Sequence, residues 1–173
     1  MALSNPYRGE RRPGYVGQAL PDVAVRLVDE EGGIVTGEDA PAEIQIQGPA
    51  VFLEYWGNAE ATEASFFDEW FCTGDIAVIE DGYYRIMGRS SVDIIKSGGY
   101  KLSALEIENT LLGHPQIAEV AVVGIADRTW GAAVAAVVAL KGHDGIILED
   151  LRGWCDGKLS SYKVPKQLRV VGA

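Results

Sequence analysis

Apolar and polar positions in the first half of the chain follow the period of two that is typical of half-buried strands. Residues 23–28 read Val-Ala-Val-Arg-Leu-Val and predict one strand, and residues 43–47 alternate around two isoleucines and predict another. A Glu-Gly-Gly turn separates them. Residues 1–22 are rich in Gly, Pro and Arg without strong periodicity, so they predict a loop.

A helix and a hairpin are predicted next. Residues 58–67 have the mixed polar and apolar spacing of a surface helix. Two short apolar runs, residues 76–80 and 83–87, flank Asp81-Gly82, a pair that favours a two-residue hairpin turn.

Counting outward from that turn predicts which residues face each other. Asp75 is expected to face Gly88, with Arg89 one residue further along. Opposed residues lie about 5 Å apart at their Cα atoms, so Asp75 and Arg89 should emerge at the same open end and reach one small ligand.

The second half alternates strand and helix. After residue 88 the composition changes to small and polar residues, which indicates a domain boundary. Ser103 and Glu106 have the spacing of a capping box, and Gly113-His114-Pro115 is a stop signal, so a helix should lie between them. Buried strands are predicted at residues 120–123 and 134–140, and a helix at 148–159. The fold class is therefore mixed α+β.

Composition excludes several classes of protein. Of 173 residues 47% are hydrophobic and 23% charged, as in a globular protein with a core. The net charge of −10, without a basic cluster, argues against nucleic acid and against an anionic membrane as partners. No apolar run has the length of a membrane span. Cys72 and Cys155 indicate no disulfide framework, and His114 and His143 show no metal-ligand spacing.

The chemistry of the hairpin end suits a ribose. A carboxylate such as Asp75 accepts hydrogen bonds from two adjacent hydroxyls, and the guanidinium of Arg89 is a rigid fork of donors. A plain salt bridge that closes the hairpin is the alternative. Spacing alone leaves both open.

Three motifs in order resemble the adenylate-forming superfamily, which includes acyl-CoA synthetases, luciferases and peptide-synthetase adenylation domains. They are Trp-Phe-Cys-Thr-Gly-Asp (70–75), Gly-Tyr-Tyr-Arg-Ile-Met-Gly-Arg (82–89) and Asp-Ile-Ile-Lys-Ser-Gly-Gly-Tyr-Lys-Leu-Ser-Ala-Leu-Glu-Ile-Glu (93–108). Residues 48–56 and 160–166 also fit. The resemblance implies that residues 1–88 are the β-rich end of a large AMP-binding domain. Residues 89–93 would be a hinge, and 94–173 a small, truncated α/β domain with a short sheet flanked by helices.

The same resemblance assigns roles to residues. Asp75 is expected to bind the ribose of ATP or AMP, and Arg89 to contact the nucleotide. Ser91 or Asp93 is expected to be the pivot of the hinge. The loop Gly98-Gly99-Tyr100-Lys101 is expected to line the pantetheine tunnel for CoA, since paired glycines allow close backbone approach.

Further residues resemble the malonyl-CoA synthetase subgroup, among them the segments 1–9 and 12–17. Ser4 and the arginines at 8, 11 and 12 are then candidate neighbours of a dicarboxylate, although loop arginines are more often solvated. Asp22 and Ala42 stand where glycine is usual, which questions the turn geometry there.

The implied activity is that of an ATP-dependent acyl-CoA ligase acting on a small carboxylic acid, with malonate or methylmalonate favoured. ATP, CoA and Mg²⁺ would serve it together with the rest of the ligase chain. The phosphate loop and the C-terminal Gly-Lys lysine are expected outside these residues, so that no catalytic residue is expected within them. Cytosol and mitochondrial matrix both fit. A non-catalytic nucleotide-binding or interaction module, and an adenylation domain serving a carrier protein, are the alternatives.

Overall fold

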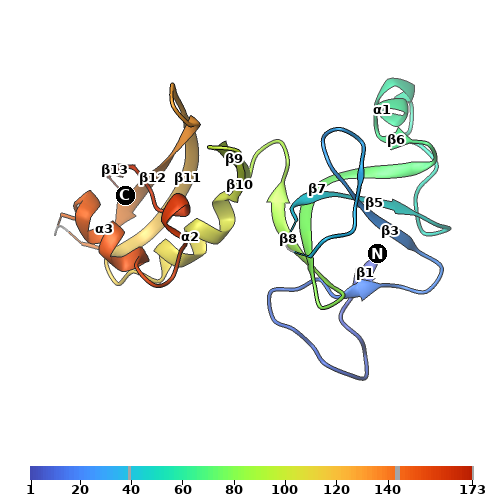
Figure 1. Ribbon diagram of the computed structural model, residues 1–173, viewed down its shortest axis with the longest axis horizontal. Coiled ribbons are helices and arrows are strands. Elements are labelled where there is room, and N and C mark those ends of the chain that lie inside the picture. The colour runs from blue at the N-terminus through green and yellow to red at the C-terminus, as the bar shows by residue number, and fades with distance from the viewer. Residues whose placement is uncertain (39, 143–144, 173) are drawn as a thin grey trace. The chain divides into compact units, whose positions relative to one another are not determined.

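The computed structural model describes residues 1–38, 40–142 and 145–172. The chain folds as two compact units, Met1–Ser91 and Val92–Ala173 (Figure 1). His143, considered above for metal spacing, lies outside the described residues.

The first unit is built on an antiparallel sheet. Its strands lie in the order β4-β3-β5-β7-β6, and β8 pairs with β7. Their bounds are β3 (Ala24–Val28), β4 (Ile34–Val35), β5 (Ala42–Gln47), β6 (Phe66–Phe67), β7 (Trp70–Glu80) and β8 (Tyr83–Arg89). The two strands expected near residues 23–28 and 43–47 are thus confirmed as β3 and β5.

The predicted hairpin is confirmed, but its register is wrong by one residue at the open end. Near the turn the pairing is as expected, with Ile79 facing Tyr84. A bulge then inserts Met87 as an extra residue of β8, so that Asp75 faces Arg89 directly instead of Gly88. A bulge bends a strand and redirects its side chains. It brings the two candidate ligand-binding residues into cross-strand register.

The first 22 residues are more ordered than a plain loop. β1 (Leu3–Ser4) pairs with β2 (Gln18–Ala19), and Tyr84 of β8 exchanges backbone hydrogen bonds with Val16 and Gly17. Periodicity could not reveal two-residue strands. Asp22 has a positive φ of 63°, so the position where glycine is usual does hold an aspartate in the left-handed region.

The helix predicted at residues 58–67 is shorter, α1 (Ala59–Ala64), with Asn58 as its N-cap. The following residues form β6 because Phe66 packs on Phe52 and Phe71, with ring centroids 5.7 and 5.5 Å away. Aromatic packing onto β7 therefore outweighs continuation of the helix.

The second unit holds a hairpin, a three-stranded sheet and two helices. In the sheet β12 lies centrally, antiparallel to β11 and parallel to β13. The bounds are β9 (Ile94–Ser97), β10 (Tyr100–Ser103), α2 (Ala104–Leu112), β11 (Ile117–Asp127), β12 (Gly131–Leu140), α3 (Leu148–Cys155), the 3₁₀ turn η1 (Ser161–Lys163) and β13 (Gln167–Val171). The mixed α+β fold class is confirmed.

Three expectations for this unit change in detail. The strand predicted as buried at 120–123 belongs to β11, an edge strand in which Val122 is buried but Ala121 and Val123 are exposed. The second helix ends at Cys155 instead of 159, because Gly157 takes a positive φ of 67°. No strand was expected for β13, whose partner β12 is about 30 residues away in the sequence.

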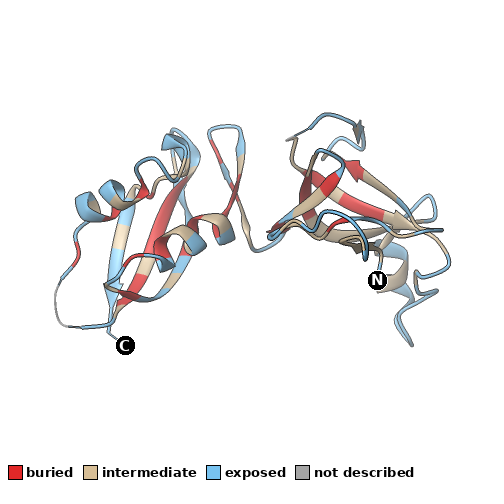
Figure 2. Cartoon of the chain, turned by 90° about the horizontal axis from the view of Figure 1, so that it is seen from below, coloured by how far each residue is buried: buried red, intermediate tan, exposed pale blue. Residues whose placement is uncertain are grey.

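The core of the second unit lies between its sheet and its helices. Figure 2 shows the buried positions along the strands and on the inner sides of the helices. Ile107 and Leu111 of α2 and Leu151 of α3 are fully buried, with Ile117 and Val138 of the sheet at 1% and 0% exposure. A period of three to four residues along α2 directs this apolar face inward.

Replacing Leu111 by alanine is expected to reduce the free energy of unfolding by about 2–5 kcal/mol, because a buried leucine leaves a cavity. Urea unfolding of the chain, followed by circular dichroism, measures it. Leu112→Ala is the matched control, since the neighbouring leucine is 45% exposed. Equal losses for the two variants would contradict the burial described.

Candidate functional site

Asp75 and Arg89 form an ion pair at the open end of the β7–β8 hairpin. Nη1 of Arg89 lies 3.1 Å from Oδ1 of Asp75 and donates a second hydrogen bond to the carbonyl of Thr73 at 3.2 Å. The side chains are 30% exposed for Asp75 and 60% for Arg89. A carboxylate has two acceptor oxygens, so this contact still permits Asp75 to accept a hydrogen bond from a ligand. We call this pair with Thr73 and Gly74 the hairpin end.

A second irregularity supports the hairpin end from the other side. The register between β5 and β7 shifts near Glu43, so that Thr73–Asp75 departs from regular pairing. The carboxylate of Glu43 accepts from the Gly74 amide at 2.8 Å, and the Thr73 hydroxyl donates to the Ile44 carbonyl at 2.8 Å. Gly74 has a φ of 74°, which a residue with a Cβ rarely adopts. The backbone that carries Asp75 is thus fixed by side-chain bonds.

Ser91 and Asp93, the two candidate pivots, flank the boundary between the two units. On the near side, the Ser90 amide donates to the Gly74 carbonyl at 2.8 Å. On the far side, the Asp93 carbonyl accepts from the Ala104 amide at 2.8 Å. Which residue turns, and whether the segment 89–93 acts as a hinge, stays a prediction.

The glycine pair is the turn of a hairpin that strand prediction missed. Gly98 and Gly99 have φ values of 58° and 84° and join β9 to β10. Two consecutive positive φ angles are those of a type I′ turn. A Gly-Gly pair between apolar runs is a hairpin signal, so this element was available from the sequence.

Gly98 lies against Trp130. Its amide donates to the Trp130 carbonyl at 2.8 Å, and a Cβ at this position would fall 2.8 Å from Cε3 of the indole. Asp127 positions Trp130, because its carboxylate accepts the amides of Thr129 and Trp130 at 2.8 and 2.9 Å. The hydrogen bond from Trp130, followed by that from Thr129, lowers the pKa of Asp127.

A cavity of about 250 Å³ opens beside this turn. We call it the Trp130 cavity; its lining residues are Ser97, Gly98, Tyr100, Trp130, Ser161, Tyr162 and Lys166. The rings of Tyr100 and Tyr162 stack with centroids 4.6 Å apart and an interplanar angle of 11°. Nζ of Lys166 lies 4.2 Å from the centre of the Trp130 ring. Flat aromatic surfaces and an ammonium group meet here.

Of the predicted loop, Gly98 and Tyr100 line the Trp130 cavity. Gly99 forms the tip of the turn, and Lys101 faces Lys96 across the hairpin. Sequence reasoning assigned no role to Trp130, Tyr162 or Lys166, although residues 160–166 carried part of the resemblance. Trp130 lies about 30 residues from both the glycine turn and Tyr162 in the sequence, and only the fold brings them together.

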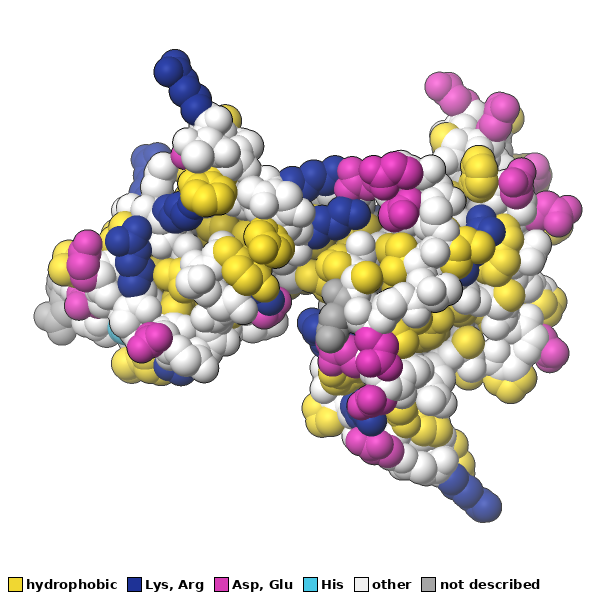
Figure 3. Space-filling model, viewed as in Figure 1, with side chains coloured by type: hydrophobic (Ala, Val, Ile, Leu, Met, Phe, Trp, Pro, Cys, Tyr) yellow, Lys and Arg dark blue, Asp and Glu magenta, His cyan; other side chains and the backbone are white. Residues whose placement is uncertain are grey.

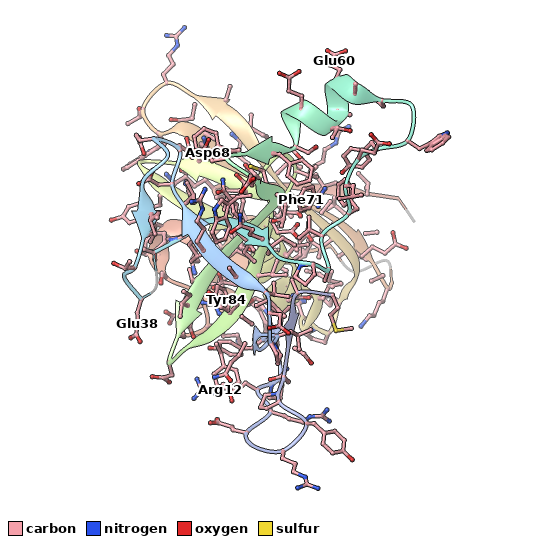
Figure 4. All side chains as sticks on the ribbon, turned by 90° about the vertical axis from the view of Figure 1, so that its right-hand side faces the viewer. Arg12, Glu38, Glu60, Asp68, Phe71 and Tyr84 are labelled. Carbon is pink, nitrogen blue, oxygen red and sulfur yellow. The ribbon has the colours of Figure 1, made fainter. Side chains whose placement is uncertain are left out.

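The four residues expected near a dicarboxylate have different surroundings. Arg12 forms ion pairs with Glu10 and Asp81 at 3.0 and 3.1 Å and lies over the Tyr83 ring at 4.4 Å, so it holds the N-terminal segment to the hairpin turn. Figure 4 shows Arg12 at this end of the first unit and Glu60 of α1 at the other. Ser4 and Arg11, together with Arg12, line a cavity of about 510 Å³. Arg8 is an exposed side chain.

Residues 1–38, 40–142 and 145–172 contain no group of three His, Cys, Asp or Glu side chains arranged to hold a metal ion. Within the same residues, no helix has the length and apolar character that crossing a bilayer requires.

Residues 106–173 match the family model described as the AMP-binding enzyme C-terminal domain. The matched residues lie in the second unit. The chain is 47% identical to the mitochondrial malonate–CoA ligase ACSF3 of Bos taurus over 99% of its own length and 33% of that relative. It is 45% identical to a malonate–CoA ligase of Arabidopsis thaliana over 98% of its own length and 29% of the relative.

The chain is also similar to solved structures of CoA ligases. ATP-bound MatB from Rhodopseudomonas palustris superposes with a TM-score of 0.82 at 37% identity, covering 99% of this chain and 34% of that one. The o-succinylbenzoate CoA synthetase MenE from Bacillus subtilis, in complex with its acyl-adenylate OSB-AMP, gives 0.79 at 31% identity, covering 91% and 32%. The chain thus spans about one third of the length of the ligases it matches.

Gly98→Ala is expected to destabilise the chain more than Gly99→Ala. Each substitution puts a Cβ at a positive φ, which costs about 1–2 kcal/mol. Only at Gly98 does the new atom also meet the indole of Trp130, whereas nothing lies within 4 Å of a Cβ at Gly99. Chemical unfolding of both variants measures the difference, and equal losses would contradict the contact between Gly98 and Trp130.

Proposed function

We propose that the chain is the nucleotide- and CoA-binding part of an ATP-dependent acyl-CoA ligase. The whole ligase would join a small carboxylic acid to AMP, release pyrophosphate and then transfer the acyl group to the CoA thiol. The direct register of Asp75 and Arg89 at the hairpin end carries this proposal. Malonate is the favoured acid, since relatives at 45–47% identity are named malonate–CoA ligases, and methylmalonate is its near neighbour.

In this proposal Asp75 and Arg89 hold the nucleotide. The carboxylate of Asp75 accepts from the ribose hydroxyls, and Arg89, 60% exposed, donates to ribose or phosphate oxygens. The bulge and the bonds to Glu43 and Ile44 fix the backbone before any ligand binds. Preorganisation of this kind reduces the entropic cost of binding.

CoA is assigned to the second unit. Every lysine of the chain lies there, whereas acidic side chains spread over the first unit on the face in Figure 3. CoA carries several phosphates and an adenine ring, and the Trp130 cavity offers aromatic faces and the ammonium of Lys166. Gly98 and Gly99 would let pantetheine pass close to the backbone, with Tyr100 and Lys101 beside it.

The remaining assignments complete the ligase. Mg²⁺ would enter with the phosphates of ATP. Rotation of residues 94–173 against residues 1–88 about the segment 89–93, with Ser91 or Asp93 as pivot, would exchange the groups that face the adenylate. The cytosol and the mitochondrial matrix both fit, and the relative from Bos taurus is named as mitochondrial.

Asp75→Asn should weaken AMP binding by the chain about 10- to 100-fold, because a charge-assisted hydrogen bond contributes about 1.5–3 kcal/mol. Isothermal titration calorimetry with AMP measures the effect. The matched control is Asp68→Asn, which makes the same chemical change at an exposed turn position and should bind AMP like the unaltered chain.

Equal AMP affinity in Asp75→Asn and in the unaltered chain would contradict the nucleotide-binding role and would mean that the ion pair only closes the hairpin. Pyrophosphate release by the chain alone would contradict its assignment as a part of the catalytic unit.

A further inference from the structure

Lys163 and Glu106 form a tight ion pair in the second unit. Nζ of Lys163 lies 2.6 and 2.8 Å from the two carboxylate oxygens of Glu106. The side chains are only 18% and 34% exposed. Exposed pairs contribute little to stability because water screens them, whereas partly buried pairs with short bonds fix geometry more strongly.

The position of Lys163 depends on Glu106 for an electrostatic reason. Glu106 lies in the first turn of α2 and is its only acidic residue there. The N-terminal end of a helix carries a partial positive charge, which disfavours a nearby ammonium group. The negative charge of the Glu106 carboxylate makes the interaction attractive. Without this charge, the ammonium group of Lys163 would be repelled from the helix end.

The adjacent residue, Tyr162, contacts the strand that precedes α2 in the sequence. Its ring stacks on Tyr100, the first residue of β10. β10 runs directly into α2 through Ser103, whose hydroxyl accepts from the Glu106 amide at 3.2 Å. Tyr162 and Lys163 are therefore fixed at two points of one continuous piece of backbone, residues 100–106.

The short η1 turn needs these attachments. A three-residue 3₁₀ turn has poor hydrogen-bond geometry and little stability of its own. Beyond η1 the chain is held again, since the Lys166 amide donates to the Val134 carbonyl at 2.8 Å. Ser161 and Tyr162 form one wall of the Trp130 cavity, so the shape of the cavity follows the position of η1.

We propose that Glu106 and Lys163 are positioning residues that hold Tyr162 on Tyr100 and thereby set the Trp130 cavity in the shape that binds CoA. This inference rests on the proposed assignment of CoA to that cavity. Neither residue of the pair lines the cavity, so both act through η1.

Glu106→Gln tests the pair in the complete 173-residue chain, with CoA affinity measured by calorimetry. Couplings between distinct sites change affinity by about 5- to 150-fold, and we expect a loss near the lower end, about 5- to 20-fold. AMP affinity should not change. Glu108→Gln is the matched control, because this residue lies on the same helix and its carboxylate accepts from the Val122 amide at 2.8 Å, away from η1.

Lys163 provides the rescue test. Lys163→Met should lose CoA affinity to the same degree as Glu106→Gln, whereas Lys163→Arg should retain it, because arginine pairs with a carboxylate through two parallel bonds. A lower unfolding midpoint with unchanged CoA affinity in Glu106→Gln and Lys163→Met would overturn the inference and leave the pair a merely structural role.

The ring resonances of Tyr100 and Tyr162 in nuclear magnetic resonance spectra separate this inference from the proposed function. If the unaltered chain binds no CoA, the assignment of CoA to the cavity fails. Shifted ring resonances in Glu106→Gln would still support the positioning of Tyr162, and unshifted ones would overturn it.

Discussion

The pairing of Asp75 with Arg89 depends on a single extra residue in β8. In a regular hairpin Asp75 would face Gly88, and Arg89 would point to the opposite side of the sheet, because successive side chains alternate between faces. The bulge at Met87 shifts the register by one residue and puts both side chains on one face, 3.1 Å apart. Next to this end of the hairpin, Thr73–Asp75 departs from regular pairing with β5.

In the second unit, too, an irregular piece of backbone positions the candidate binding residues. The tight Gly98-Gly99 turn allows the indole of Trp130 to lie against the backbone, and the stacked tyrosines close the cavity from another side. Both candidate sites thus lie where a glycine or a bulge interrupts a regular strand pair. Binding residues often occupy such irregular segments, because a rigid sheet beside them fixes their position.

Local signals predicted much of the fold. Asp81-Gly82 gave the hairpin, Ser103 gave the start of α2, and apolar runs gave β3, β5 and β12. Two helices were predicted too long. α3 ends early because Gly157 takes a positive φ, and Phe66 belongs to a strand instead of a helix because it packs on Phe71. Periodicity carries no information about either effect.

The sites were predicted less completely than the fold. Asp75 and Arg89 could be placed at one end of a hairpin from the turn alone, but no local pattern predicted the bulge that aligns them. Gly98, Trp130 and Tyr162 come from three segments that only the fold of the second unit brings together. Pairing between segments distant in the sequence leaves no local pattern.

The most direct test of the account is a nuclear magnetic resonance titration of the chain with AMP and, separately, with CoA, following each backbone amide. The account predicts that AMP shifts amides at the hairpin end, around Asp75 and Arg89, and that CoA shifts those lining the Trp130 cavity. Shifts by both ligands at one common set of residues, or AMP binding that leaves the hairpin end unperturbed, would contradict it.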